Sequence, residues 1–279
     1  MNQSNYYPSQ DPIIKMQQEM KLRNFSPKTI KSYSYYITNI LHFANKGASS
    51  ISTEDIRNYL ESLSNLNSSA STLNSAYSAL KFYFEKILRR KFFAHIPRAK
   101  KEKKLPTVLS KEEIRRMIDA VKNPKHQCIL QLLYGSGLRV SEIIKIRMND
   151  FDFDRKLLHI KGGKGNKDRY TIFSEKIIMI LKEQRKIKNT DSYLFTGYDK
   201  KSPLSTVSIN KIVKQASEIA KINKNVSAHS LRHSFATHLL ENGTSIRYIQ
   251  ALLGHARLET TQIYTKVCSY NLKNITSPW

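Results

Sequence analysis

The sequence predicts a mainly helical protein with a small antiparallel β-sheet in its second half, an α+β fold in two domains. Segments with apolar residues at helical spacing, several of them behind a helix-capping residue, fill most of the chain. Two short runs rich in β-forming residues flank a glycine-rich loop, as in a β-hairpin. A basic stretch that ends at a proline divides the chain into two parts.

The first two helices begin with the same signal. Asp11 and Ser26 are N-cap residues, and each is followed by proline, which is favoured at the first helical position. Behind Ser26, apolar residues recur at helical spacing, namely Ile30, Tyr33, Ile37 and Leu41.

Two further helices complete the first domain. Ser52 with Asp55 resembles a capping box, which predicts the start of a third helix. A fourth helix begins at about Ser71, and its apolar face consists of Leu73, Tyr77, Leu80, Phe84 and Leu88. Four helices with short polar links form a small bundle, and we assign residues 7–93 to it.

Residues 94–106 are predicted to link the two domains. The segment Arg98–Pro106 is basic and has few apolar residues to bury. Two roles are open for this segment: a solvated tether, or a stretch that lies along a phosphate backbone.

The second domain, residues 107–276, combines further helices with the small sheet. Ser110 with Glu113 has the spacing of a capping box, and a helix through residues 129–133 leads to a glycine-rich turn at 134–137. Residues 157–160 and 170–173 are the predicted strands, with the glycine-rich loop 162–168 between them. Beyond residue 175 the pattern is mostly helical.

Composition points to a polyanionic partner. The chain has 47 lysines and arginines against 22 acidic residues, a formal charge of +25. Nucleic acid is the commonest partner of so basic a protein, while a ribosomal or membrane-surface protein is the alternative. The two cysteines lack CxxC spacing, so neither a disulfide framework nor a metal site of the zinc type is predicted.

The sequence also predicts where the protein acts. Met1–Gln10 is polar and lacks the apolar centre of a secretory signal. No run of about 18 apolar residues occurs, so we expect no membrane-spanning helix. We therefore expect a cytoplasmic protein with reduced thiols and no membrane partner.

Residues suited to attack on a phosphodiester gather in the last third of the chain. Arg232 offers a rigid fork of donors for phosphate oxygens, and His229 and His255 can exchange protons near neutral pH. Tyr264 can act as a covalent nucleophile. Each residue taken alone has an ordinary structural explanation, because a helix edge with His and Arg is usually a solvated surface.

Two candidates precede this group. Arg139 stands at the start of a predicted helix, where Glu142, one turn on, can pair with it structurally. Lys164 lies at the tip of the glycine-rich loop, where the backbone can approach a ligand closely. A lysine on such a loop is more often simply solvated.

Taken together, these segments resemble a known family. Gly-Leu-Arg139-Val-Ser-Glu142, Gly-Lys164-Gly-Asn-Lys-Asp-Arg169, His229-Ser-Leu-Arg232-His233, Leu-Leu-Gly-His255 and Thr-Thr-Gln-Ile-Tyr264 occur in that order. The second domain thereby resembles the catalytic domain of the tyrosine recombinases, the phage-integrase family. The first resembles that family's SAM-like core-binding domain. Within the family the chain is most similar to the Xer-type recombinases, although its C-terminal tail is also similar to integrases of mobile elements.

The resemblance implies a mechanism. Tyr264 attacks the scissile phosphate and forms a 3′-phosphotyrosyl link, while Arg139 and Arg232 grip the non-bridging oxygens. His255 donates a further hydrogen bond and Lys164 protonates the leaving 5′-oxygen. His229 accepts or relays the proton of the nucleophile. The resemblance implies no metal and no ATP, and the sequence has no cluster of acidic residues that predicts a metal site.

The expected partner is double-stranded DNA at a specific recombination site. Six basic residues of the first domain are candidate phosphate contacts, although each can equally be a solvated charge: Lys28, Lys31, Lys81, Lys86, Arg89 and Arg90. Asn74 and Ser75 are weaker candidates for contacts with base edges. By resemblance the active assembly is a homotetramer, or a heterotetramer with a second recombinase. A last helix at residues 267–275 docks on a neighbour or on its own domain.

Four functions fit these residues. The leading one is a Xer-type recombinase that resolves chromosome dimers. The second is an integrase that integrates, excises or exchanges a mobile element. The third is a DNA-binding protein that has lost catalysis, which the intact set of six residues disfavours. The fourth is a type IB topoisomerase, which the small first domain disfavours.

Overall fold

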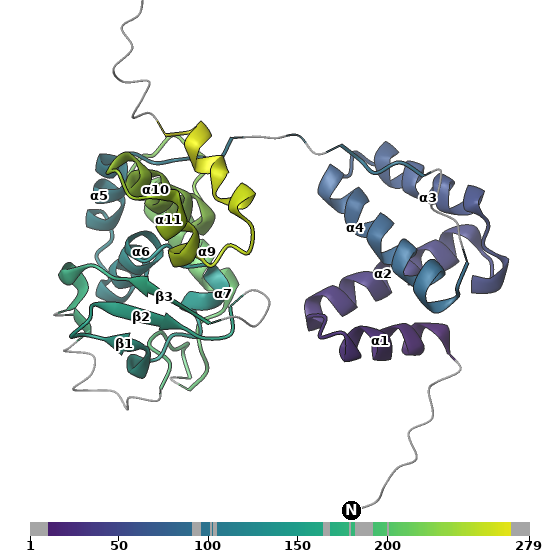
Figure 1. The fold of residues 1–279 in the computed structure, drawn as a ribbon, viewed down its shortest axis with the longest axis horizontal. Coiled ribbons are helices and arrows are strands. Elements are labelled where there is room, and N and C mark those ends of the chain that lie inside the picture. Colours follow the sequence, from purple (N-terminus) through teal and green to yellow (C-terminus); the bar gives the residue numbers. More distant parts are fainter. Residues whose placement is uncertain are drawn as a thin grey trace, which may run out of the picture. The chain divides into compact units, whose positions relative to one another are not determined.

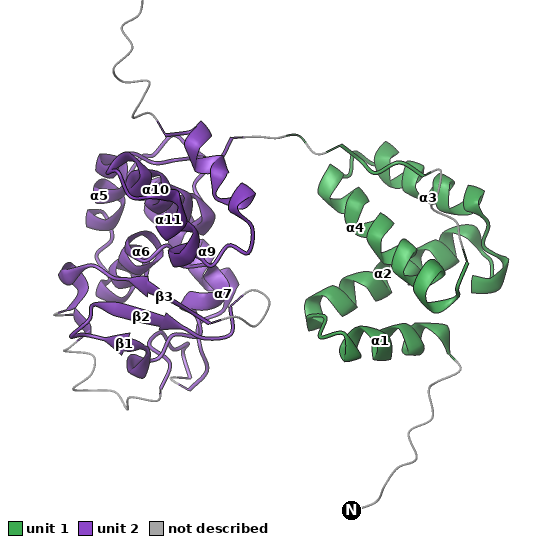
Figure 2. Ribbon diagram, viewed as in Figure 1, with its two compact units in different colours: residues 1–103 green, residues 104–279 purple. Residues whose placement is uncertain are grey.

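The computed structural model describes residues 11–90, 96–100, 102, 105–163, 168–178, 180–181, 192–199 and 201–268. The chain divides into two compact units, residues 1–103 and residues 104–279 (Figure 2). The predicted fold class, mainly helical with a small antiparallel sheet in the second unit, is confirmed. Among the described residues no helix is both long and apolar enough to span a membrane.

The first unit consists of four α-helices around an apolar core (Figure 1). The helices are α1 (Pro12–Leu22), α2 (Pro27–Ala44), α3 (Thr53–Asn65) and α4 (Ala70–Lys81). The predicted caps at Asp11, Ser26 and Ser52 are present, and each side chain accepts hydrogen bonds from backbone N–H groups of the first turn. These bonds satisfy donors that a helix cannot satisfy internally, which explains why the starts could be predicted.

The fourth helix begins within one residue of the predicted start at about Ser71. It begins at Ala70 behind a Ser69 cap, and it continues into a π-helical segment, Phe82–Ile87. That segment buries Tyr83 and Phe84 in the core of the unit. The extra residue per turn of a π-helix therefore shifts which side chains of the segment face inward.

The first described part of the linker is attached to this unit. The guanidinium of Arg98 lies 4.7 Å from the centre of the Tyr77 ring. The Asn74 amide donates to the carbonyl of Ala99 at 2.7 Å and to that of Ala70 at 2.8 Å. Residues 96–99 are thus held on α4 and are not a free tether, and the Asn74 amide is occupied inside the unit.

The second unit packs helices against a three-stranded sheet. The helices are α5 (Lys111–Asp119), α6 (Pro124–Gly135), α7 (Val140–Ile143), α9 (Thr206–Ile219), α10 (Ala228–Glu241) and α11 (Ile246–Leu253). The α6 helix supplies Ile129, Leu132 and Leu133 to the core, all fully buried. Of the predicted last helix, residues 267–275, the structure describes Val267 and Cys268. The other residues of that range lie outside the described part of the chain.

The sheet is antiparallel, in the order β1-β2-β3. Its strands are β1 (Phe151–Asp152), β2 (Leu157–Ile160) and β3 (Arg169–Ile172). The predicted hairpin is present, with His159 opposite Tyr170, and β3 begins one residue earlier than predicted. Strand β1 was not predicted, because two residues are too few to show an alternating pattern of apolar and polar side chains.

Candidate active site

Five of the six predicted catalytic residues come from four segments of the second unit. Arg139 directly precedes α7, His229 and Arg232 lie in the first turns of α10, His255 follows α11, and Tyr264 lies in a 3₁₀ turn, Gln262–Lys266. Figure 1 shows α10 and α11 next to each other, and β3 is in contact with α11. Lys164 falls outside the described residues.

The start of α10 orients three of the functional side chains. The helix begins at Ala228, behind a Ser227 cap whose hydroxyl accepts from the backbone N–H of Ser230. The sequence alone does not decide between Ser227 and Ser230 as the cap, because serine is a good cap residue at either position. The start at Ala228 places His229, Arg232 and His233 within one helix, at spacings that share a face.

Arg232 is buried and fully oriented by backbone groups. Its residue is 3 % exposed, and its two terminal nitrogens donate to the carbonyls of Gly137 and Leu253, each at 2.6 Å. Gly137 has φ +60°, and a Cβ there would lie 2.4 Å from a ring carbon of Phe235. Only glycine therefore lets this turn approach α10 and present its carbonyl to Arg232.

A single carboxylate holds the other guanidinium groups. Glu142 is 5 % exposed and accepts from the backbone N–H of Arg139 at 2.8 Å and from its guanidinium at 2.6 Å. Arg169 donates to both carboxylate oxygens, at 2.8 and 3.0 Å, and Arg232 lies 3.8 Å away. Although burial opposes ionisation, Arg169 and Arg139 keep the pKa of Glu142 below its usual value. Three guanidinium groups around one carboxylate leave a surplus of positive charge.

His255 is held between this cluster and Thr261. Gly254 ends α11 with φ +62°, a left-handed conformation that glycine adopts at the ends of many helices. His255 Nε2 lies 3.3 Å from a terminal nitrogen of Arg232, and Nδ1 lies 3.0 Å from the Thr261 hydroxyl. Since a guanidinium can only donate, Nε2 accepts here and Nδ1–H donates to Thr261. A hydroxyl can also donate, so Thr261 can serve the other tautomer as well.

Tyr264 is enclosed by histidines and is 2 % exposed. Its hydroxyl lies 3.2 Å from Nδ1 of His233, and its ring is stacked with that of His255 at 6.4 Å between centres. Burial raises the pKa of Tyr264, although the charges of Arg232 and Arg139 oppose the rise. The ring of His229, the predicted proton acceptor, lies 6.4 Å from that of His233, and His233 is the histidine whose nitrogen lies at the Tyr264 hydroxyl.

The pKa values of the three histidines of this site are all lowered, which favours their neutral form. Burial, followed by the charge of Arg232 and other neighbours, lowers the pKa of His255 to about 4. Burial and the neighbouring His229 and Arg232 lower that of His233 to about 4. Burial and the charges of Arg232 and Arg139 lower the pKa of His229. Neutral imidazoles can accept a proton or donate an N–H, as proton transfer requires.

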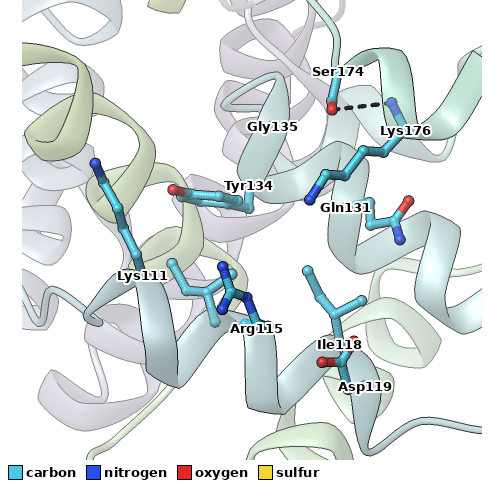
Figure 3. Close-up of a pocket in the computed structure, with 10 residues that line it drawn as sticks. Lys111, Arg115, Ile118, Asp119, Gln131, Tyr134, Gly135, Ser174 and Lys176 are labelled. Atoms are coloured by element: carbon cyan, nitrogen blue, oxygen red, sulfur yellow. Dashed lines mark hydrogen bonds between the residues drawn. The ribbon is translucent and has the colours of Figure 1, made fainter. Parts of the chain in front are cut away.

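A separate cavity of about 330 Å³ lies between α5 and α6 (Figure 3). Ile118 and Tyr134 form part of its apolar wall, and Lys111, Arg115 and Lys176 lie around it. None of the described catalytic candidates lines this cavity. Across the described residues, no three His, Cys, Asp or Glu side chains are grouped as they would be around a metal ion.

The candidate DNA contacts of the first unit differ in exposure. Four of them are exposed: Lys28, Lys31, Lys86 and Arg89. Lys81 lies 3.7 Å from Glu85, and Arg90 donates to the carbonyl of Ser49 at 2.8 Å. The first four are therefore freer to meet a phosphate than the last two.

Comparison with known proteins identifies the family. The model of the phage integrase family matches residues 107–269, and that of the phage integrase N-terminal SAM-like domain matches residues 13–93. The chain belongs to the phage integrase family. The prediction from the ordered motifs, a tyrosine recombinase with a SAM-like first domain, is confirmed.

Individual relatives cover nearly the whole chain. A putative integrase/recombinase of Sinorhizobium fredii is 34% identical over 268 residues, which cover 95% of this chain and 87% of the relative. Tyrosine recombinase XerA of Pyrococcus horikoshii is 35% identical over 257 residues, covering 91% and 88%. The structure of XerH site-specific recombinase bound to difH substrate matches with a TM-score of 0.70 at 22% identity, covering 96% of this chain and 90% of that one, and so shares the fold.

Three residues have roles in this site that the sequence did not reveal. His233 holds the hydroxyl of Tyr264, Arg169 binds Glu142 in bidentate fashion, and Glu142 serves more than its expected partner, Arg139. His233 had a usable signal, because it lies four residues after His229 and so on the same helix face. Arg169 had none, since its partners are distant in sequence.

Proposed function

We propose that this recombinase cuts and rejoins double-stranded DNA at a specific site, with Tyr264 as the nucleophile. The observation that carries the proposal is the convergence of Tyr264, Arg232, Arg139 and His255 beside a surplus of positive charge. As the phosphorus becomes five-coordinate in the transition state, negative charge builds up on the non-bridging oxygens. A positively charged cluster stabilises that charge.

The proposed reaction begins with attack of the Tyr264 oxygen on the scissile phosphorus. A new P–O bond forms to the tyrosine, the bond to the 5′-oxygen breaks, and the strand remains attached through a 3′-phosphotyrosyl link. A phenol titrates near 10, so its proton must pass to a base, for which neutral His229 is proposed. Lys164 supplies a proton to the leaving 5′-oxygen. Rejoining reverses these steps and needs no ATP, because the phosphodiester bond energy is kept in the covalent link.

Arg139 and Arg232 are proposed to hold the non-bridging oxygens, with His255 as an additional donor. His255 can donate from Nε2 once Arg232 turns its N–H toward the phosphate, since Thr261 accepts or donates as needed. The guanidinium charges fill the role that a metal ion plays in other phosphodiester chemistry. Cleavage should therefore persist in the presence of a chelator such as EDTA.

Tyr264 must become more exposed before it can react. At 2 % exposure, with its hydroxyl on His233, the side chain is closed off from a duplex. We therefore propose that binding of DNA, or of a neighbouring subunit on DNA, turns Tyr264 outward. The active assembly is proposed to be a homotetramer, or a heterotetramer with a second recombinase.

DNA affinity is proposed to come in part from Lys28, Lys31, Lys86 and Arg89, with smaller parts for Lys81 and Arg90. Contacts with phosphate make binding depend steeply on salt. We expect the affinity to fall by roughly 10³-fold or more between 50 and 200 mM salt if six or more phosphates are neutralised. A flat response to salt would argue against DNA contacts of this kind.

The biological role has two candidates, both supported by similar relatives. Similarity to XerA supports a Xer-type role in resolving chromosome dimers. For this role we propose that the enzyme works in the cytoplasm, on the chromosome. Similarity to a putative integrase/recombinase favours integration or excision of a mobile element. A recombination site beside the replication terminus would indicate the first role, and a site at the ends of an element would indicate the second.

The experiment is to trap the covalent complex. Wild type and Tyr264→Phe are each incubated with nicked, fragmented genomic DNA of the source organism, denatured, and the protein-linked fragments sequenced. We expect wild type alone to be linked, at one recurrent locus. Equal linkage by Tyr264→Phe would refute Tyr264 as the nucleophile. Binding without linkage by the wild type would indicate a binding-only protein or an enzyme that requires a partner.

A further inference from the structure

Arg169 is a third arginine in the catalytic cluster. It is the first residue of β3, directly after the loop that carries Lys164, and its side chain is 8% exposed. A buried guanidinium is retained at such a position only when its donors are satisfied. Its hydrogen bonds therefore show what it holds in place.

Its terminal nitrogens bind the carboxylate at the centre of the cluster. Nη1 donates to one oxygen of Glu142 at 2.8 Å and Nη2 donates to the other at 3.0 Å. This bidentate geometry is the strongest that arginine forms with a carboxylate. Each oxygen of Glu142 thereby has one donor from Arg169 besides those it has from Arg139.

Without Arg169, the same carboxylate would compete with a phosphate. Glu142 lies 2.6 Å from the guanidinium of Arg139 and 3.8 Å from that of Arg232. A buried carboxylate with no other cation would bind both arginines more tightly, and its charge would repel an incoming phosphate. Arg169 supplies the compensating charge from the side of β3.

The third donor of Arg169 reaches the segment that carries His255. Its Nε donates to the carbonyl of Leu252 at 2.7 Å. Its aliphatic part covers Gly254 so closely that a Cβ at that glycine would lie 2.7 Å from Arg169 Cδ. These bonds run where β3 is in contact with α11. Arg169 thus joins the end of α11 to the carboxylate.

We propose that Arg169 is a positioning residue for strand cleavage: it binds and neutralises Glu142, and so leaves Arg139 and Arg232 available to the scissile phosphate. The inference rests on the proposed function. Arg169 itself does not touch the DNA in this scheme. It acts through Glu142, and through Leu252 it also fixes the end of α11 beside His255.

The test compares two substrates that differ by one charge. DNA carrying the recombination site is made with either an ordinary scissile phosphodiester or one resolved isomer of a methylphosphonate, in which a methyl group replaces a charged oxygen. Single-turnover cleavage by Arg169→Met should fall about 10- to 10²-fold on the phosphodiester, less than the loss of a direct donor. On the neutral methylphosphonate the loss should be at most about threefold, because less negative charge has to be stabilised there.

A second substitution tests the route through Glu142. If the unpaired carboxylate is what harms cleavage in Arg169→Met, then Arg169→Met combined with Glu142→Gln should cleave faster than Arg169→Met alone. A glutamine oxygen can still accept from Arg139 without its charge. Arg169→Lys, which keeps the charge but not the fork, should fall between wild type and Arg169→Met.

Controls separate positioning from folding. Arg147→Met removes another arginine of this unit, whose guanidinium lies 4.6 Å from the centre of the Tyr193 ring. It should change the cleavage rates of the two substrates by the same factor. DNA affinity and the thermal midpoint are measured for every variant, and Arg169→Lys carries the test if Arg169→Met does not fold. An equal loss on both substrates, or no loss, would overturn the proposal. Absence of cleavage by the wild type would instead refute the proposed function.

Discussion

Replacing Arg232 by lysine tests whether the fixed donors of the guanidinium, and not only its charge, stabilise the transition state. Arg232 reaches the carbonyls of Gly137 and Leu253 from two different nitrogens, each at 2.6 Å. A lysine has one nitrogen and cannot serve both carbonyls and a phosphate at once. Arg232→Lys therefore keeps the charge and removes the geometry.

The size of the effect follows from these bonds. Losing one donor to a developing oxyanion costs about 10²–10³ in rate, and we expect Arg232→Lys to lose at least 10²-fold in single-turnover cleavage. Arg232→Ala should lose at least as much, with DNA affinity retained within a few-fold. One buried carbonyl without a donor should lower the free energy of unfolding by about 1–3 kcal/mol.

The assay is cleavage of a nicked substrate that traps the covalent complex, with unfolding in urea measured in parallel. Arg115→Lys is the matched control, because Arg115 is an exposed residue of α5 whose contact with Glu112 spans 3.5 Å. It should leave both rate and stability unchanged. A cleavage rate for Arg232→Lys within tenfold of wild type, in a folded protein, would refute the assignment of Arg232.

Three further predictions concern the same site. In the DNA-free protein, the hydroxyl of Tyr264 and the ring of His233 share one hydrogen bond. A double-mutant cycle of His233→Leu and Tyr264→Phe, measured by urea unfolding, should therefore show a coupling energy of about 0.5–1.5 kcal/mol. Additive effects of the two substitutions would show that the bond does not contribute to stability. The pKa values of His233 and His255 are lowered to about 4, so between about pH 6.5 and 4 the unfolded chain binds protons that the folded chain does not. Stability should therefore fall as the pH is lowered through that range, and His233→Leu should flatten the profile; a urea midpoint that stays constant from pH 7 to 4.5 would contradict the burial of these rings. Gly254→Ala should cost about 1 kcal/mol or more in urea unfolding, because the residue has φ +62° and the new methyl group meets Arg169; an unchanged midpoint would mean that the turn relaxes freely.

Most helix starts could be predicted because a cap is a local arrangement. Asp11, Ser26 and the pairs Ser52–Asp55 and Ser110–Glu113 each satisfy backbone donors within one turn. The start of α10 is harder to predict, because two serines, Ser227 and Ser230, lie near it. Local chemistry allows either serine as the cap, and tertiary packing decides between them.

The candidate site likewise combines features that the sequence predicts with features that depend on tertiary contacts. The structure describes five of the six predicted residues. Four of these lie close together: Arg139, Arg232, His255 and Tyr264. The ordered motifs predicted this grouping only through the resemblance to a family. The bonds that hold them depend on contacts between segments far apart in the chain. Arg169 looks in the sequence like the last residue of a basic loop, and its role is visible only where β3 meets α11.

The missing Cβ of Gly254 has a consequence for how such enzymes vary. The side chain of Arg169 fills the space that any other residue at position 254 would need. A side chain at position 254 is therefore accommodated only after Arg169 has been replaced by a smaller residue, and the φ of +62° still disfavours it there. Libraries that aim to retarget this recombinase should vary the two positions together, or leave both untouched.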